Sequence, residues 1–298
     1  MDLGQLEAFV AICRSGSFHA AARALHLSQP AITSRIRALE YAAGADLLIR
    51  KRGHVAPTDA GRALLPHARA ALDAVAEAHR AVGGARESGT VRLAVSVNAG
   101  AYLLPELLRS FWARHTLIEV DVRVCPAAEV ASRVLDGEAQ IGLTRPAPEQ
   151  SGLVLHRFPD DPVRLVVPPD HPFASHPSVT SAEVAAEQRL IVSSDKAYWE
   201  DLRAQFARAG AAVHPVLDAG LLEVSKQLVT AGIGVAFLPE LLVREELRTG
   251  RLVAVPVADL ELPVVSAAIL RAEGRDLPAP AAALWEVATG DEVTLLVA

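Results

Sequence analysis

Apolar residues recur three or four positions apart near the start of the chain, which is the spacing of the buried face of a helix. The pattern predicts a first helix over residues 3–14, a second over residues 17–25, and a third that begins near Ser28. A serine hydroxyl can accept hydrogen bonds from the free amides of a helix start, and Pro30 is tolerated in a first turn. The N-terminal segment is therefore expected to form a small helical unit.

The third predicted helix has an apolar side and a polar side. Its apolar side carries Ile32, Ile36 and Leu39. Glutamine can pair with adenine and arginine with guanine through two hydrogen bonds each, so the polar side suits a recognition helix in a major groove. A merely solvated polar face is the alternative that this helix by itself leaves open. The residues predicted to contact DNA here are Ser28, Gln29, Pro30, Thr33, Ser34 and Arg37.

A short basic hairpin is predicted after the third helix. Residues 47–49 are typical of an apolar strand, and residues 50–54 form a tight basic turn that leads to Val55. Arg50 and Arg52 would contact phosphates or enter the adjacent minor groove, which positions a protein on DNA and adds salt-dependent affinity. An ordinary surface loop is the alternative interpretation.

Two stretches of the sequence resemble a known family. The segment SFHAAARALHLSQPAITSRIRALE, residues 17–40, is similar to the winged helix-turn-helix of LysR-type transcriptional regulators. The similarity continues through GADLLIRKRGHVAPTDAGRALLPHA, residues 44–68, and more loosely to the C-terminus. Leu48 and Pro57 depart from the family pattern, which usually has phenylalanine and leucine there. The resemblance implies a homodimer, assembling further to a homotetramer, that binds an interrupted palindromic DNA operator and responds to a small-molecule effector.

A long helix should connect the two parts of the chain, running from Thr58 and Asp59 to about Val82. Apolar positions alternate by three and four along it, as in the seam of a coiled coil, and a second copy of the helix is the simplest partner. Docking onto the chain's own body is the alternative. The predicted dimerisation residues are Leu65, Ala68, Leu72, Val75 and Val82.

Beyond the glycine-rich segment 83–89 the pattern changes to short apolar strands that alternate with helices, which is typical of parallel α/β units. The predicted fold is multidomain: an all-α winged helix-turn-helix with a long linker helix, then a two-lobed α/β effector domain like a periplasmic binding protein. The expected domains are residues 1–58, 59–90 and 91–298. Lobe I would comprise 91–161 and 265–298, and lobe II 162–264.

Polar residues that follow the predicted strands mark a candidate effector site. Ligands of open α/β lobes bind beyond the carboxyl ends of the strands, often at helix N-termini that attract anions. Hydroxyls, amides and a cation there suit a carboxylate or another small oxyanion, and the family resemblance also implies effector contacts at these loops. Helix capping is an equally good account of each single serine or asparagine. The candidate residues are Ser96, Asn98, Ala99, Gly100, Thr144, Arg145, Ser193 and Ser194.

Charge and composition restrict the remaining possibilities. The chain has a net charge of −6, but residues 1–62 hold eight basic and five acidic residues, a net +3, so the remainder carries −9. This distribution is consistent with one DNA-facing end. The N-terminus lacks a secretory signal pattern and no apolar run would span a membrane, so a cytoplasmic protein is expected. Cys13 and Cys125 are expected to be buried, reduced thiols.

Catalytic and metal motifs are weak in this sequence. It has no Gly-x-Ser-x-Gly elbow or phosphate-binding loop, and Gly232-Ile233-Gly234 lacks the third glycine of a dinucleotide fingerprint. We therefore expect no enzymatic activity, no cofactor and no metal. The competing hypothesis is a solute-binding or enzymatic α/β protein whose N-terminal helices serve only dimerisation. It leaves the outward Gln29, Thr33 and Arg37 unexplained.

Overall fold

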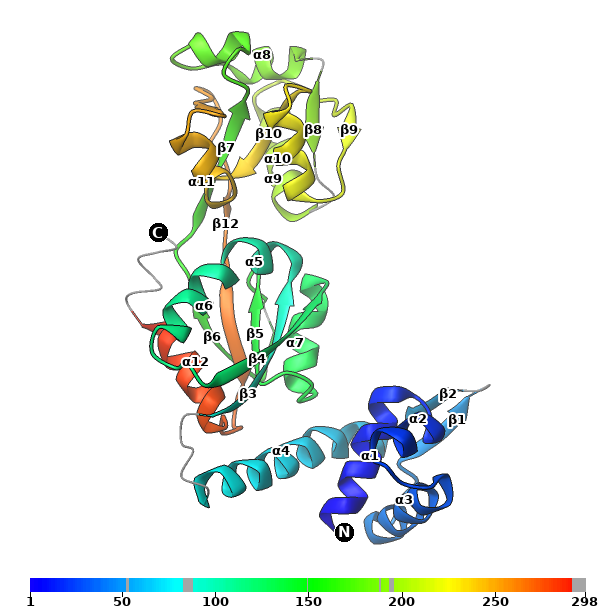
Figure 1. The fold of residues 1–298 in the computed structure, drawn as a ribbon. Coiled ribbons are helices and arrows are strands. Elements are labelled where there is room, and N and C mark those ends of the chain that lie inside the picture. Colours follow the sequence, from blue (N-terminus) through cyan, green and yellow to red (C-terminus); the bar gives the residue numbers. More distant parts are fainter. Residues whose placement is uncertain (52–53, 83–87, 149, 188, 193–195, 291–298) are drawn as a thin grey trace.

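The computed structural model describes residues 1–51, 54–82, 88–148, 150–187, 189–192 and 196–290. Figure 1 shows three parts: a helical N-terminal domain with a small hairpin, one long helix, and two α/β lobes stacked above that helix. In the described residues no helix is both long enough and apolar enough to cross a membrane. The predicted combination of a winged helix-turn-helix with a two-lobed α/β domain is confirmed.

The N-terminal domain packs three helices against one hairpin. The helices are α1 (Leu3–Ser15), α2 (Phe18–Ala24) and α3 (Gln29–Ala43), and the antiparallel strands are β1 (Leu48–Lys51) and β2 (His54–Pro57). Asp2, Ser17 and Ser28 cap the three helices by accepting hydrogen bonds from backbone amides. The core between these elements is apolar, and its fully buried side chains include Phe9, Ile12, Ile32, Leu39 and Leu47.

Helix α4 (Asp59–Val82) leaves the N-terminal domain and passes beneath lobe I (Figure 1). Leu65 and Ala68 are buried in the same apolar cluster as α1 and α3. The side of α4 away from that cluster faces lobe I, where Asp73 pairs with Arg92 of the first lobe I strand. The helix therefore contacts both the N-terminal domain and lobe I.

Lobe I is a five-stranded sheet with the order β4-β3-β5-β13-β6. Its strands are β3 (Gly89–Ser96), β4 (Ile118–Cys125), β5 (Ile141–Thr144), β6 (Leu153–Arg157) and β13 (Ala268–Ala272). β3 runs parallel to β4 and β5, whereas β13 is antiparallel to β5 and β6. Its helices are α5 (Val97–Tyr102), α6 (Leu104–Trp112), α7 (Ala127–Leu135) and α12 (Ala279–Thr289).

Lobe II is a second sheet with the order β11-β7-β10-β8-β9. Its strands are β7 (Asp161–Val167), β8 (Leu190–Val192), β9 (Leu217–Asp218), β10 (Val235–Pro239) and β11 (Val253–Val255). The covering helices are η1 (Pro172–Ser175), α8 (Ser181–Ala186), α9 (Lys196–Arg208), α10 (Leu222–Thr230) and α11 (Glu240–Arg248). β12 (Val264–Val265) pairs antiparallel with the start of β7, so two adjacent crossings join the lobes.

Candidate functional site

The outward residues of α3 lie together on the surface of the N-terminal domain. Gln29, Pro30, Ser34 and Arg37 are exposed, and with the half-buried Thr33 they line one shallow depression. The Ser28 hydroxyl accepts a hydrogen bond from the Ala31 amide at 3.3 Å, and this cap starts the helix at Gln29. Five of the six predicted residues thus line one depression, and the sixth, Ser28, is the N-cap of the helix that carries them.

The opposite side of α3 is fixed by packing and by two polar contacts that the sequence did not indicate. Ile32 and Leu39 are fully buried. Arg35 donates a hydrogen bond from Nη1 to the Gly4 carbonyl at 3.2 Å, which ties α3 to α1. Glu40 accepts from the Leu47 amide at 2.9 Å, which ties α3 to the hairpin. These contacts leave α3 little freedom to rotate about its axis.

Strand β2 of the hairpin is held against the turn after α1. The Val55 amide donates to the Gly16 carbonyl at 2.9 Å, and Val55 is buried. Gly16 has a φ of +65°, a conformation that favours glycine, and a Cβ there would also displace the ring of the exposed His54. Arg50 belongs to β1, but its side chain and the whole of Arg52 lie outside the described residues.

The predicted dimerisation residues lie in different environments. Leu65 and Ala68 are covered by the chain's own N-terminal core, and Leu72 packs against the edge of that core. Val75 is half-buried, and the Val82 side chain lies outside the described residues. Leu65 and Ala68 therefore have little apolar area left for a second copy.

Ser96 connects the two lobe I loops that carry the predicted effector contacts. Its side chain is buried, and its Oγ accepts from the Ala99 amide at 3.4 Å and from the Arg145 amide at 3.1 Å. These bonds cap α5 and join the loop after β3 to the loop after β5. Of the other first-loop residues, Ala99 is buried, whereas Asn98 and Gly100 are half-buried. The capping alternative is therefore the observed role of the Ser96 hydroxyl in this structure.

Arg145 forms a buried ion pair between the end of lobe I strand β5 and the start of lobe II strand β7. Its Nη2 lies 2.6 Å from Oδ2 of Asp161, and the two side chains are only 2% and 6% exposed. The other Asp161 oxygen accepts from the Leu241 amide of lobe II at 3.1 Å. Thr144, fully buried, donates from Oγ1 to the Pro146 carbonyl at 3.4 Å. The charge of Arg145 is thus balanced within the chain while this pair is formed.

A polar contact between the lobes escaped the sequence analysis. Tyr102 of α5 donates its hydroxyl proton to Oε2 of Glu223 on α10 at 3.3 Å. Burial, followed by the charge of Glu223, raises the pKa of Tyr102, so the phenol stays protonated. Burial alone would raise the pKa of Glu223, but hydrogen bonds from Gln227 and Lys226 outweigh it and lower that pKa. No motif singles out Tyr102, because only the folded arrangement of the two lobes brings it to Glu223, 121 positions away in the sequence.

The remaining predicted residues are two serines of lobe II and the two cysteines. Ser193 and Ser194 lie outside the described residues. Cys125 is buried and Cys13 half-buried, and burial raises the pKa of the Cys13 thiol to about 11. Within the described ranges, no three His, Cys, Asp or Glu side chains are grouped closely enough to hold a metal ion.

Comparisons with known proteins agree with this architecture. Residues 3–62 match the model of the bacterial regulatory helix-turn-helix protein, lysR family, and residues 84–291 match the LysR substrate binding domain. The HTH-type transcriptional regulator CitR of Bacillus subtilis is 34% identical over 90% of this chain and 92% of its own length.

Two solved structures share the fold over the full chain. A full-length OxyR variant from Pseudomonas aeruginosa has a TM-score of 0.74 at 21% identity and covers 99% of this chain and 95% of its own. Full-length CbnR in complex with its target DNA has a TM-score of 0.60 at 22% identity, with complete coverage of both chains. Together with the two family models, these likenesses confirm the resemblance seen in the sequence: the chain belongs to the LysR family of DNA-binding transcriptional regulators, with an effector-binding domain.

Proposed function

We propose that this regulator acts in the cytoplasm as a homodimer, assembling further to a homotetramer, and binds an interrupted palindromic operator through α3 and the β1–β2 hairpin. The observation that carries the proposal is the depression formed by Gln29, Pro30, Thr33, Ser34 and Arg37 on the exposed side of a helix whose other side is buried. Rigid support of base-reading side chains is what a recognition helix needs. Arg50 and Arg52 would add phosphate contacts from the wing.

Dimerisation follows from the symmetry of such an operator, because two half-sites require two copies of the recognition helix. The proposed contact is the part of α4 from the edge of the N-terminal core onward, through Leu72, Val75 and Val82. The solved CbnR complex, in which a chain of this fold is bound to target DNA, supports this mode of binding.

The proposed effector is a small anion held between the lobes. The proposed contacts from lobe I are Ser96, Asn98, Ala99, Gly100, Thr144 and Arg145, and those from lobe II are Ser193 and Ser194. The hydrogen bond between Ser96 and the Arg145 amide supports this location, because it brings the two lobe I loops together at the carboxyl ends of β3 and β5. The effector would change the separation of the lobes and, through α4, the geometry of the bound DNA.

The test is binding of the purified full chain to DNA from around its own coding region, titrated with salt and nonspecific competitor. We expect competitor-resistant binding that Arg37→Ala weakens and that Arg203→Ala, a matched change at an exposed arginine of α9 in lobe II, leaves unchanged. Equal binding by both variants would remove α3 from the interface. A protein that binds small anions but no DNA would support the solute-binding alternative instead.

A further inference from the structure

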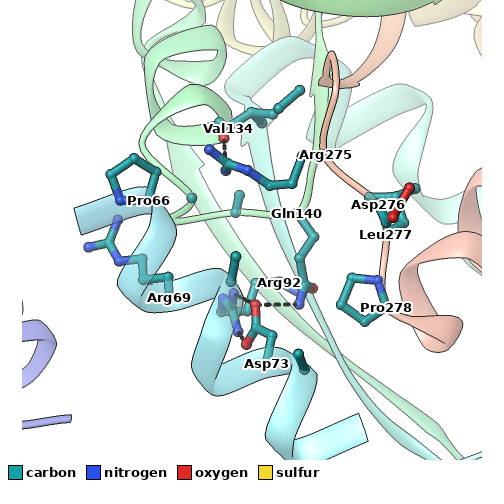
Figure 2. A pocket seen from close by; sticks show the side chains of 15 residues that line it. Pro66, Arg69, Asp73, Arg92, Val134, Gln140, Arg275, Asp276, Leu277 and Pro278 are labelled. Carbon is teal, nitrogen blue, oxygen red and sulfur yellow. Dashed lines mark hydrogen bonds and ion pairs between the residues drawn. The ribbon is translucent and has the colours of Figure 1, made fainter. Parts of the chain in front are cut away.

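A cavity of about 230 Å³ lies outside the lobes, between α4 and the lower edge of lobe I (Figure 2). One wall is the lobe-facing side of α4, with Pro66, Ala70 and Ala74. The opposite wall is lobe I, with Val134 from α7 and Leu277 from the segment before α12. Most of the lining is apolar, and an apolar cavity of about 150 Å³ is already large enough to hold benzene.

The polar groups on the α4 side of the cavity are occupied by one another. Arg92 holds Asp73 with two hydrogen bonds, of 3.0 Å from Nη1 and 2.8 Å from Nη2. Gln140 completes this network by accepting from the Arg92 amide at 2.8 Å. Arg69 donates to the Asp136 carbonyl at 2.7 Å and lies 3.7 Å from a Glu138 oxygen. These contacts fix α4 on lobe I and leave the cavity as a defined space between them.

Arg275 is the exception among the cations around the cavity. Its Nη1 and Nη2 donate to the carbonyls of Val134 and Leu135 at 3.4 Å and 3.1 Å, at the end of α7. Among the residues that the structure describes, no carboxylate lies within ion-pair distance of it. A guanidinium has five N–H donors, so the two carbonyl contacts leave donors unused. The carboxylates that share its surroundings are Asp136, whose pKa burial raises and the charge of Arg275 lowers, and Asp276, which also lines the cavity, and neither forms an ion pair with it. Figure 2 shows this side chain at the cavity, above Gln140.

We propose that this cavity is a binding site for a small monocarboxylic acid with a compact apolar body. The carboxylate pairs with Arg275, and the apolar body packs between the alanines of α4 and Leu277. The Asp73–Arg92 and Arg69–Glu138 pairs lie beside the apolar body of the ligand, and the ligand does not displace them. The site is separate from the proposed effector site between the lobes.

The position of the cavity gives such a ligand a regulatory effect. Its walls come from two parts of the molecule, the helix that carries the DNA-binding domain and the lobe that it contacts, so a ligand binds only while α4 is docked. A ligand that binds only the arrangement with α4 docked on lobe I shifts the population of molecules toward that arrangement. A ligand here therefore stabilises one orientation of the DNA-binding domain relative to lobe I.

The probe for the test is 4-methylpentanoate, and 4-methylpentanamide is its uncharged control. Both are titrated calorimetrically into the full chain without DNA, so the result does not depend on operator binding. We expect saturable binding of the acid, and binding of the amide weaker by about tenfold or more because it cannot pair with Arg275. No saturable binding of the acid, or equal binding of acid and amide, would overturn the proposal.

Three variants locate the bound probe. Ala74→Leu fills the cavity with a residue that a helix accepts well, and Arg275→Gln removes the charge but keeps hydrogen-bond donors. Each should weaken binding by about tenfold or more, since affinity requires both the space and the cation. Ala63→Leu, at an exposed position of α4 away from the cavity, should have no effect. Binding that survives Ala74→Leu and Arg275→Gln, but is lost in Thr144→Val, would assign the ligand to the space between the lobes.

Discussion

Gln29 reaches solvent from the first turn of a helix whose opposite side is buried, so its removal should change recognition without changing the fold. We expect Gln29→Ala to reduce discrimination between the operator and a variant operator by about 1–3 kcal/mol, the size of one good base contact. Competition binding at fixed salt measures this difference. The unfolding midpoint should stay at the wild-type value, and full discrimination by the variant would show that Gln29 contacts no base.

The contact between Arg145 and Asp161 could not be predicted from the sequence alone. The sequence indicated Arg145 as an anion ligand from its place after a strand, but nothing near it in the chain identifies the partner 16 residues away. The partner is found only because β7 begins where the chain leaves lobe I for lobe II. Ser96 is a similar case, because its capping bond is local but its bond to the Arg145 amide is not.

Breaking this buried pair should be costly. Asp161→Ala leaves an unpaired guanidinium in an environment where both partners are almost fully covered, and we expect a loss of about 3–5 kcal/mol in the free energy of unfolding. The double variant Arg145→Met with Asp161→Leu should recover most of that loss, because no unpaired charge remains. Urea denaturation of the full chain measures both. A single variant as stable as wild type would show that water reaches the pair.

The helices and the two lobes could be predicted from the sequence because the helix caps and the pattern of apolar residues indicate the same elements. The α1, α2 and α3 starts carry side-chain caps, and their apolar positions occupy one core. Helix α4 was predicted as a helix for the same reason, but its partner was not determined by the pattern. An apolar seam does not specify which apolar surface covers it, and here the chain's own core covers the first part.

Two substitutions along α4 separate its two roles. Leu65→Ala removes a buried side chain from the N-terminal core, so we expect a loss of about 2–5 kcal/mol in the stability of that domain. Val75→Arg lies beyond that core and should instead shift the chain toward monomer in sedimentation velocity. An unchanged oligomer in Val75→Arg would place the dimer contact away from this part of α4.

The wing should act through charge. Removing one phosphate contact with Arg52→Ala should weaken binding to all DNA sequences alike and lower the salt slope of log affinity by about one unit. Binding is measured across a series of salt concentrations on operator and nonspecific DNA. An unchanged slope would remove Arg52 from the contacts.

The arrangement of the two lobes could be predicted only in outline. The alternation of strands and helices predicts two α/β lobes with paired crossings, but the contacts between the lobes depend on residues far apart in the sequence. Tyr102 and Glu223, 121 positions apart, are one such contact. The same reason explains why the cavity beneath lobe I was not foreseen: its walls combine α4 with three separate segments of lobe I.

The contact between the lobes should respond to acid. The folded-state pKa of Glu223 lies below its usual value of 4.5, so its carboxylate contributes stability that is present above that value and lost as the pH falls through the lower, folded-state pKa. We expect the unfolding midpoint in urea to decline over that acidic range in wild type, and Glu223→Gln to decline less. Tyr102→Phe removes the hydroxyl donor, so the stability that the Glu223 carboxylate contributes should become smaller. It should still be lost in acid, since Gln227 and Lys226 still contact that carboxylate. If wild type and Glu223→Gln follow the same pH profile, then the ionisation of Glu223 does not contribute to the stability of the folded chain. Tyr102 and Glu223 would then be neighbours without a stabilising contact.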